Sequence, residues 1–195
     1  MVLRSRLMKA ATLTLLSCLA ANAPLVAQES VTARMEAWAK ALGVDCAHYH
    51  VTDDWANAAK PTYDFARRMS RMVDGLNAGP LLGIAEVTCW TCHRGQSIPA
   101  RVPRESWQKI QAEHAEEFAD QKNRALTMSV YAASLGVECT HCHEAADRAA
   151  NTKPAKAMVA RMLPIFAEIP KYFDAARRPA TQCYMCHHGA TKPEK

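Results

Sequence analysis

Apolar residues recur at helical spacing in four separate stretches of this chain. In the first, Val31, Met35, Trp38 and Leu42 stand three or four residues apart, so they share one face of a helix. The other three stretches have similar spacing: Phe65, Met69, Met72, Val73 and Leu76; Met128, Tyr131 and Leu135; and Met158, Met162, Phe166 and Ile169. No segment alternates apolar and polar residues convincingly as a strand does. The pattern predicts an all-α fold.

Proline and glycine predict where several of these helices begin and end. Pro61 suits the first turn of the second helix, where its missing N–H has no intrahelical partner. Gly43 and Gly136 each follow a leucine at a predicted helix end, as glycines in the left-handed conformation do. Pro164 is expected to kink the last helix and Pro170 to end it.

The chain repeats itself at a spacing of 93 residues. Leu-Gly-Val-Asp-Cys at 42–46 recurs as Leu-Gly-Val-Glu-Cys at 135–139, and Lys60-Pro61 recurs as Lys153-Pro154. The same spacing places Met128 over Met35, Tyr131 over Trp38, His143 over His50 and Met162 over Met69. Such self-similarity indicates a tandem duplication of one helical unit.

The duplication divides the chain into a repeat at about 31–96, a linker helix within 97–123 and a second repeat at about 124–190. Near the end of each repeat the spacing slips by one residue, so that Cys89 corresponds to Cys183. The linker is expected to form a more polar helix from Arg104 to Asp120, with Trp107, Ile110 and Phe118 as its main apolar positions.

Three Cys-x-x-Cys-His motifs give the chain its chemistry. They lie at 89–93, 139–143 and 183–187 and use six of the eight cysteines: Cys89, Cys92, Cys139, Cys142, Cys183 and Cys186. In this motif the two thiols attach haem c through its vinyl groups, and the histidine (His93, His143 or His187) ligates the iron. Structural disulfides and zinc knuckles are the alternatives, but neither explains a histidine directly after each cysteine pair.

A fourth, incomplete site lies at the position equivalent to the second motif. In Cys46-Ala-His-Tyr49-His50 the first cysteine and the histidine are present, and Tyr49 stands where the second cysteine would be. We interpret it as a haem held by one thioether, from Cys46, with His50 as its ligand. The alternative is a decayed site in which Cys46 is a free thiol and His50 is a surface residue.

Methionines repeated between the halves are candidates for the sixth iron ligand. Met35 and Met128 each lie 11 residues before a first cysteine, Cys46 and Cys139. Met69 lies 20 residues before Cys89, and Met162 lies 21 before Cys183. Methionine on an apolar stripe is often ordinary core, and His48, His114, His141 and His188 remain alternative ligands. Each half would then contain two units of methionine helix, turn and haem helix around a haem-dominated core.

The N-terminus has the features of an export signal. Arg4, Arg6 and Lys9 precede an apolar segment at 10–23, and a cleavage site is expected after Ala27, which leaves 28–195 as the cytochrome domain. The predicted compartment is the periplasm, with a lipid anchor at Cys18 as a minor alternative.

Charge gives no case for nucleic-acid binding. The full chain has a formal charge of +5, and removal of three basic residues with 1–27 leaves 21 Lys and Arg against 19 Asp and Glu, or +2. Two propionates from each haem would make the loaded protein net negative by about four to six charges.

The segments at 42–55, 66–73 and 89–95 resemble the photosynthetic reaction-centre cytochrome c subunit family. The resemblance implies an all-helical protein with four haems in a row that passes electrons from a soluble donor to an oxidised partner. It also implies that Met35, Met69 and Met128 ligate three of the irons. Two departures are Tyr49 and the absence of a histidine between Val73 and Thr88, where the family has the ligand of a bis-histidine haem. Since the chain is short and lacks extended docking segments, we expect a free-standing member.

The sequence thus predicts a periplasmic electron carrier with three or four haems and no catalytic residues. Its partners would be redox proteins, with a membrane complex as one option. The alternative is a nitrogen-oxide reductase or peroxidase that uses the atypical site at Cys46, Tyr49 and His50, which requires an open coordination position on the iron.

Overall fold

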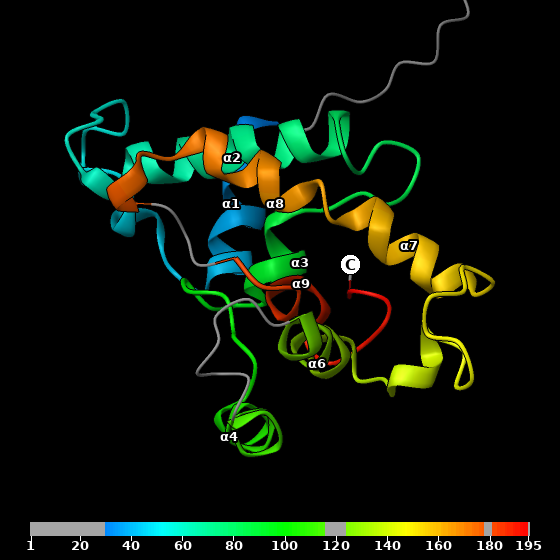
Figure 1. Ribbon diagram of the computed structural model, residues 1–195. Helices are drawn as coiled ribbons and strands as arrows, with labels where there is room; N and C mark the ends of the chain where they lie inside the picture. The colour runs from blue at the N-terminus through cyan, green and yellow to red at the C-terminus, as the bar shows by residue number, and fades with distance from the viewer. Residues whose placement is uncertain (1–29, 116–123, 178–180, 195) are drawn as a thin grey trace, which may run out of the picture.

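The computed structural model describes residues 30–115, 124–177 and 181–194, and these segments are helical without named strands (Figure 1). Within these segments, Val51 and Asp54 form an isolated antiparallel β-bridge. The elements in chain order are α1 (Val31–Leu42), η1 (Cys46–His48), α2 (Pro61–Ala78), α3 (Cys89–His93), α4 (Arg104–Glu113), α6 (Arg124–Leu135), η2 (Cys139–His141), α7 (Pro154–Met162), α8 (Ile165–Glu168), η3 (Ile169–Tyr172), η4 (Ala175–Arg177) and α9 (Tyr184–His187). The all-α prediction is confirmed for the described residues.

The helix boundaries follow the local signals. Ser30 caps α1, its hydroxyl accepting a hydrogen bond from the Ala33 N–H at 3.1 Å. Gly43 ends the same helix in the left-handed conformation with φ 64°, and Gly136 has the same φ after α6. Pro61 stands at the start of α2. The boundaries predicted at Gly43, Gly136 and Pro61 are confirmed, whereas the Ser30 cap was not predicted.

The last methionine-bearing segment is broken more completely than a kink. Helix α7 ends at Met162, and Pro164 precedes the four-residue α8. A proline cannot donate the backbone hydrogen bond that would join the two pieces. Pro170 then lies in the 3-10 turn η3, so the regular helix has already ended at Glu168.

The polypeptide core is small and centres on α2. Leu76 and Leu81 form a buried cluster with Ile169 and Phe173, and Phe65 packs on Phe173 with ring centroids 5.3 Å apart. The methionines of this region, Met69, Met72 and Met162, are partly buried against the cluster. Helix α2 runs beside α8 and η3, as Figure 1 shows.

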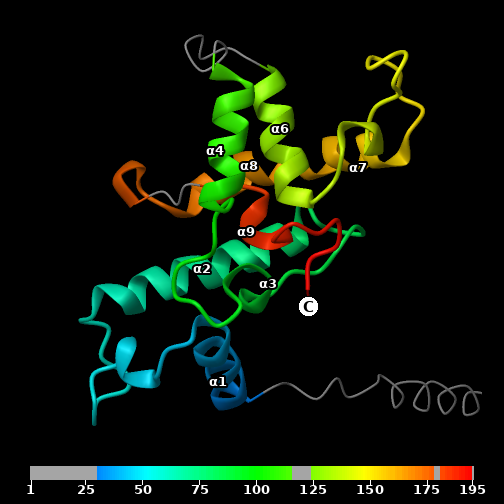
Figure 2. The same ribbon diagram turned by 90° about the horizontal axis from the view of Figure 1, so that it is seen from below.

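The two helices of the central Cys-x-x-Cys-His motifs, α3 and α9, form a row with α1 and α6, which bear Met35 and Met128. Helices α3 and α9 pack on each other in the middle, α1 packs on α3, and α6 packs on α9. Figure 2 shows this succession of α1, α3, α9 and α6, with α4 beside α6.

Matching backbone contacts hold each end of the row. The Gly95 N–H donates to the Ala41 carbonyl at 2.8 Å, and the Gly189 N–H donates to the Ser134 carbonyl at 3.0 Å. A Cβ on Gly43 would lie 2.1 Å from the Gly95 carbonyl oxygen, and one on Gly136 would lie 2.1 Å from that of Gly189. Each pair of backbones approaches so closely that only glycine leaves room.

Some expectations lie outside the described residues. These are the signal peptide with its cleavage site at Ala27, the lipid-anchor alternative at Cys18 and the linker position Phe118. The linker helix α4 begins at Arg104 as predicted and buries Ile110, but it ends at Glu113, earlier than the predicted end at Asp120, which lies outside the described residues. Of the described helices, none combines the length and apolarity needed to cross a membrane.

Candidate haem sites

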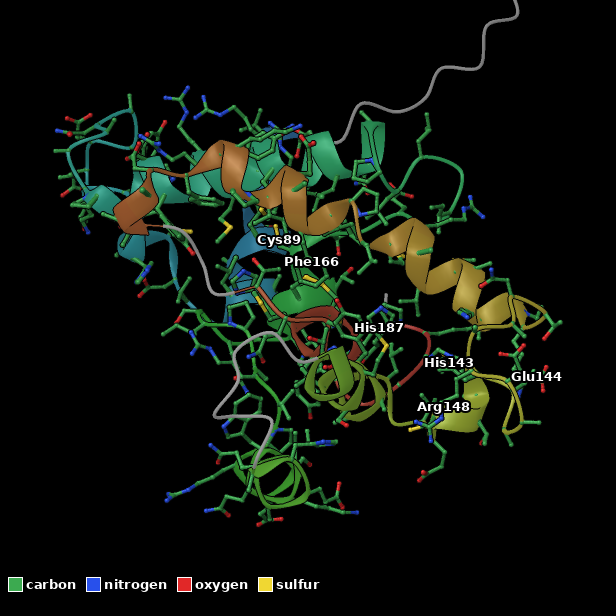
Figure 3. The ribbon with its side chains drawn as sticks, in the orientation of Figure 1. Cys89, His143, Glu144, Arg148, Phe166 and His187 are labelled. Carbon is green, nitrogen blue, oxygen red and sulfur yellow. A yellow bond between two sulfur atoms is a disulfide. The ribbon has the colours of Figure 1, made fainter. Side chains whose placement is uncertain are left out.

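Two of the motifs lie side by side at the centre of the molecule. The motif at 89–93 forms α3, where the Thr88 N–H is held by the Thr91 hydroxyl at 3.0 Å. The motif at 183–187 forms α9 with Cys183 directly before it. Their second cysteines, Cys92 and Cys186, have Cα atoms 4.2 Å apart and are joined by a disulfide. Figure 3 shows Cys89 and His187 in this central region.

The disulfide bears on the predicted thioethers. A sulfur bonded to a haem vinyl carbon cannot also form a disulfide, so the two bonding patterns exclude each other at Cys92 and Cys186. The remaining motif cysteines, Cys89, Cys139, Cys142 and Cys183, are free thiols, as is Cys46.

The two outer sites differ from the predicted haem helices. Cys46–His48 and Cys139–His141 form single 3-10 turns rather than α-helices. The segments that follow are rich in turn-forming side chains that bind their own backbone. The Asn57 amide oxygen accepts from the Ala59 N–H at 2.9 Å, and the Asp147 carboxylate accepts from the Ala149 N–H at 2.9 Å. The predicted haem α-helix is therefore wrong at both outer sites, where the turn is closed by a single α-helical bond, from the His50 N–H to the Cys46 carbonyl at 2.9 Å and from the His143 N–H to the Cys139 carbonyl at 3.0 Å.

The motif histidines share one hydrogen-bonding arrangement. In each, Nδ1 lies against a backbone carbonyl oxygen: His50 on Trp55 at 2.7 Å, His93 on Gln96 at 2.8 Å, His143 on Arg148 at 2.8 Å and His187 on Ala190 at 2.9 Å. A carbonyl only accepts, so Nδ1 carries the proton and Nε2 has a free lone pair. This is how histidines that ligate metals are usually fixed.

The atypical site shares this arrangement. His50 has the same bond as His143, its equivalent, although Tyr49 replaces the second cysteine. The ring of His50 also contacts Trp55 and Tyr63, with centroids 5.8 Å and 5.4 Å away.

Burial keeps the two central histidines neutral. It lowers the pKa of His93 and of His187, while the bonds to backbone carbonyls oppose this change. Because a protonated imidazole cannot ligate a metal, the lowered pKa maintains the ligating form at neutral pH. Burial also raises the pKa of the neighbouring thiols of Cys89 and Cys183.

A cavity of about 500 Å³ joins the first site to the second. Met35, Cys46 and His50 line it, which brings together the cysteine, histidine and methionine predicted for the first site. Met69 and Cys89 of the second site line the same cavity. Its volume lies within the usual range for organic cofactors, and its thioether, thiol and imidazole groups suit a haem.

A second cavity, of about 150 Å³, lies between the two central motifs. Met69, Met162 and both central histidines line it, together with the four cysteines of these motifs. The structure therefore brings Met162 to the Cys183 motif despite the one-residue slip between the halves.

The Cys139 site differs from the first site in the exposure of its predicted methionine. Met128 is 42% exposed and lines neither of the two cavities, and Cys139 is exposed. In Figure 3, His143 lies with Glu144 and Arg148 near α7, away from the central pair. Neither of these two cavities therefore brings Met128 together with its motif.

Tyr49 lies inside the first cavity. Burial raises the pKa of its phenol, and the neighbouring Cys89 raises it further. The phenol of Tyr49 therefore stays protonated at neutral pH.

The alternative histidine ligands are engaged elsewhere or lie on the surface. His114 Nε2 lies 2.7 Å from the Ser129 hydroxyl, and His188 Nε2 lies 2.9 Å from the Met185 carbonyl oxygen. His48 and His141 are exposed. No set of three His, Cys, Asp or Glu side chains in the described segments is arranged to hold a bare metal ion.

Two equivalent lysines were not predicted as site residues. The Lys60 ammonium donates to the Ala47 carbonyl, and that of Lys153 donates to the Thr140 carbonyl. Each ties the residue after a first haem cysteine to the start of the helix that bears the next methionine, α2 or α7. The recurring Lys-Pro pair was the sequence signal for this contact.

The model of one known family, the photosynthetic reaction centre cytochrome C subunit, matches residues 25–138. The chain belongs to this family. Membership makes it a c-type cytochrome, a carrier of electrons with covalently bound haem c that works with redox partners. The match includes the first site and the motif at 89–93 and ends just before Cys139, so the last two sites of this reaction-centre cytochrome homologue depend on their own geometry.

Proposed function

We propose that this reaction-centre cytochrome homologue is a four-haem electron carrier exported to the periplasm. The observation that carries the proposal is the shared fixing of His50, His93, His143 and His187 through Nδ1, with Nε2 left free. This geometry recurs at the atypical site and at the two sites beyond the family match. It supports four haems rather than three.

The residues that would hold each haem follow from these placements. Cys46 would supply one thioether at the first site. In each of the three complete motifs, which begin at Cys89, Cys139 and Cys183, the two cysteines would supply one thioether each. His50, His93, His143 and His187 would each supply an imidazole ligand to the iron. Met35, Met69 and Met162 would supply the second ligand at their sites, and Met128, which is exposed here, is the sequence candidate for that role at the Cys139 site. Each haem supplies an iron that cycles between Fe(II) and Fe(III), and the soft methionine sulfur favours the reduced form.

We further propose that Cys92 and Cys186 carry thioethers in the mature protein, so that the disulfide belongs to the chain before haem attachment. An external dithiol reductant would return both sulfurs to thiols, which then add to the haem vinyl groups. The contact between α3 and α9 puts the two central sites together. Helices α1 and α6, which lead into the Cys46 and Cys139 sites, pack on α3 and α9 from the two sides. The four haem sites would then follow one another in space in the order Cys46, Cys89, Cys183 and Cys139. This row gives electrons a path from end to end without any substrate bound to iron.

The matched contacts at the two ends of the row support the tandem duplication. Glycine pairs, lysine contacts and histidine contacts all recur between 31–96 and 124–190. We propose that the signal peptide is removed after Ala27, with lipidation of Cys18 as the alternative. The donor and acceptor would be redox proteins, with a membrane complex as one candidate and a free-standing carrier as our preference.

A haem count and a redox titration of the exported protein test this function. We expect four haems per chain by pyridine haemochrome, reversible reduction, and no spectral change when carbon monoxide is added to the reduced protein. His50→Ala is expected to lose the spectrum of one haem, while the exposed neighbour control His48→Ala keeps all four. Carbon monoxide or nitrite binding by the wild-type protein would favour the reductase or peroxidase alternative at Cys46, Tyr49 and His50.

A further inference from the structure

The side chain of Arg94 crosses from the first repeat to the second. Arg94 directly follows His93 and ends α3 in the left-handed conformation with φ 47°. One terminal nitrogen of its guanidinium donates to the Cys186 carbonyl at 3.3 Å. The other lies 3.6 Å from the Glu194 carboxylate. Arg94 is therefore a first-repeat residue whose charge lies beside the second-repeat motif.

The equivalent residue in the second repeat does not make this crossing. His188 has nearly the same backbone, with φ 49°, but its Nε2 lies 2.9 Å from the Met185 carbonyl oxygen within its own motif. The two central sites therefore differ. The Arg94 guanidinium lies against the 183–187 segment of the other repeat, whereas the equivalent imidazole of His188 contacts its own motif.

The Arg94 charge is poorly screened by water. Its side chain is 21% exposed, and its Nε atom is buried without a hydrogen-bond partner. The Glu194 side chain is 60% exposed, so solvent weakens its compensating negative charge. A partly buried cation acts over a longer distance than an exposed one because the surrounding dielectric constant is lower.

We propose that Arg94 raises the reduction potential of the haem at Cys183, Cys186 and His187, an inference that rests on the proposed function. Oxidation of that iron adds one positive charge, and a fixed guanidinium beside the attachment segment repels it. The reduced state is therefore favoured. Arg94 acts through charge and position and makes no bond to the iron, so it is a positioning residue. It makes the potentials of the two central haems unequal.

Charge-changing variants of the holoprotein test the proposal by spectroelectrochemical titration. Arg94→Gln is expected to shift one midpoint potential to a more negative value, and Arg94→Lys to restore most of it. Glu194→Gln removes the partial compensation and is expected to shift the same midpoint in the positive direction. Arg104→Gln, which loses a positive charge on the exposed start of α4, is the control and should leave the midpoints unchanged.

Two results would overturn the proposal: equal shifts in Arg94→Gln and Arg104→Gln, or an Arg94→Lys midpoint as low as that of Arg94→Gln. The second would show that hydrogen-bond geometry, not charge, is responsible. If Arg94→Gln misfolds, Glu194→Gln still tests the proposal, because an unchanged midpoint potential in the Glu194→Gln variant would also contradict the role of Arg94. Mass analysis of the 183–187 peptide distinguishes a failure of the proposed function from a failure of the role given to Arg94. A wild-type peptide without haem refutes the proposed function at this site, whereas a haem-bearing peptide with unmoved potentials refutes the role of Arg94 alone.

Discussion

Replacement of Gly43 by alanine tests the contact that joins the first methionine helix to its neighbour. Gly43 has φ 64°, and a Cβ there would lie 2.1 Å from the Gly95 carbonyl oxygen. Alanine in the left-handed conformation costs about 1–2 kcal/mol. The overlap is with backbone, which cannot move away like a flexible side chain, so α1 and the segment after α3 must separate.

The expected destabilisation exceeds that of a simple backbone strain. Overpacking adds about 1–3 kcal/mol, which gives a total of about 2–5 kcal/mol, a large part of the 5–15 kcal/mol stability typical of a domain. Gly83 provides a matched control, since it has φ 71° and nothing within 4 Å of an added Cβ. Gly83→Ala should therefore lose only the strain of about 1–2 kcal/mol.

Urea unfolding of the holoproteins, followed by far-UV circular dichroism, measures both variants. Equal m-values with a lower midpoint for Gly43→Ala would show a pure change in stability. Gly136→Ala should behave like Gly43→Ala because its Cβ would meet the Gly189 carbonyl oxygen at the same 2.1 Å. If Gly43→Ala is no less stable than Gly83→Ala, the close approach of the two backbones is refuted.

Three further predictions concern the sites. Tyr49→Cys completes the first motif and allows a second thioether, which removes one conjugated vinyl group from that haem. The pyridine haemochrome spectrum should therefore move to shorter wavelength while the haem count stays the same; an unaltered spectrum would contradict a haem at this site. Met35→Ala removes the sulfur that shares a cavity with His50, so the reduced protein should gain one carbon monoxide site and one midpoint should fall; a variant that still excludes carbon monoxide would refute Met35 as ligand. Chain exported under haem limitation should contain the Cys92–Cys186 disulfide in a non-reducing peptide map, whereas pairing of Cys92 within its own motif would contradict the packing of α3 on α9.

The sequence predicted those parts of the structure that depend on local chemistry. The apolar stripe from Phe65 to Leu76 became α2, and Gly43 and Gly136 ended helices, because spacing and backbone freedom are properties of the residues themselves. The repeat also drew attention to Cys46 and His50, whose motif is incomplete, and His50 has the same hydrogen-bond arrangement as the complete sites.

Features that depend on distant parts of the chain were missed. The packing of α3 on α9 brings together Cys92 and Cys186, which are 94 residues apart, and no periodicity reports such a contact. The contact of Arg94 with the second repeat could not be predicted for the same reason, because its partner is distant in the sequence and the equivalent residue, His188, is of another type. The 3-10 turns after Asp45 and Glu138 were predicted as helices because a motif gives the ligands and not the backbone bonds that follow them.

The exposed Met128 is the weakest part of the predicted ligand set. It occupies the position equivalent to Met35 but lies 42% exposed and outside both cavities. The Cys139 site thus matches the Cys46 site in its histidine and lysine contacts and differs from it in enclosure. A loaded protein with three methionine-ligated haems and a fourth of different spectrum would reflect this difference.

The intact mass of the exported holoprotein under denaturing conditions tests the central claim most directly, because covalently attached haem survives denaturation and is counted with the chain. We predict the mass of the chain with four haems, and the mass with three after Cys46→Ala. A wild-type mass with three haems, unchanged by Cys46→Ala, would contradict the single thioether at Cys46 and the continuous four-haem row.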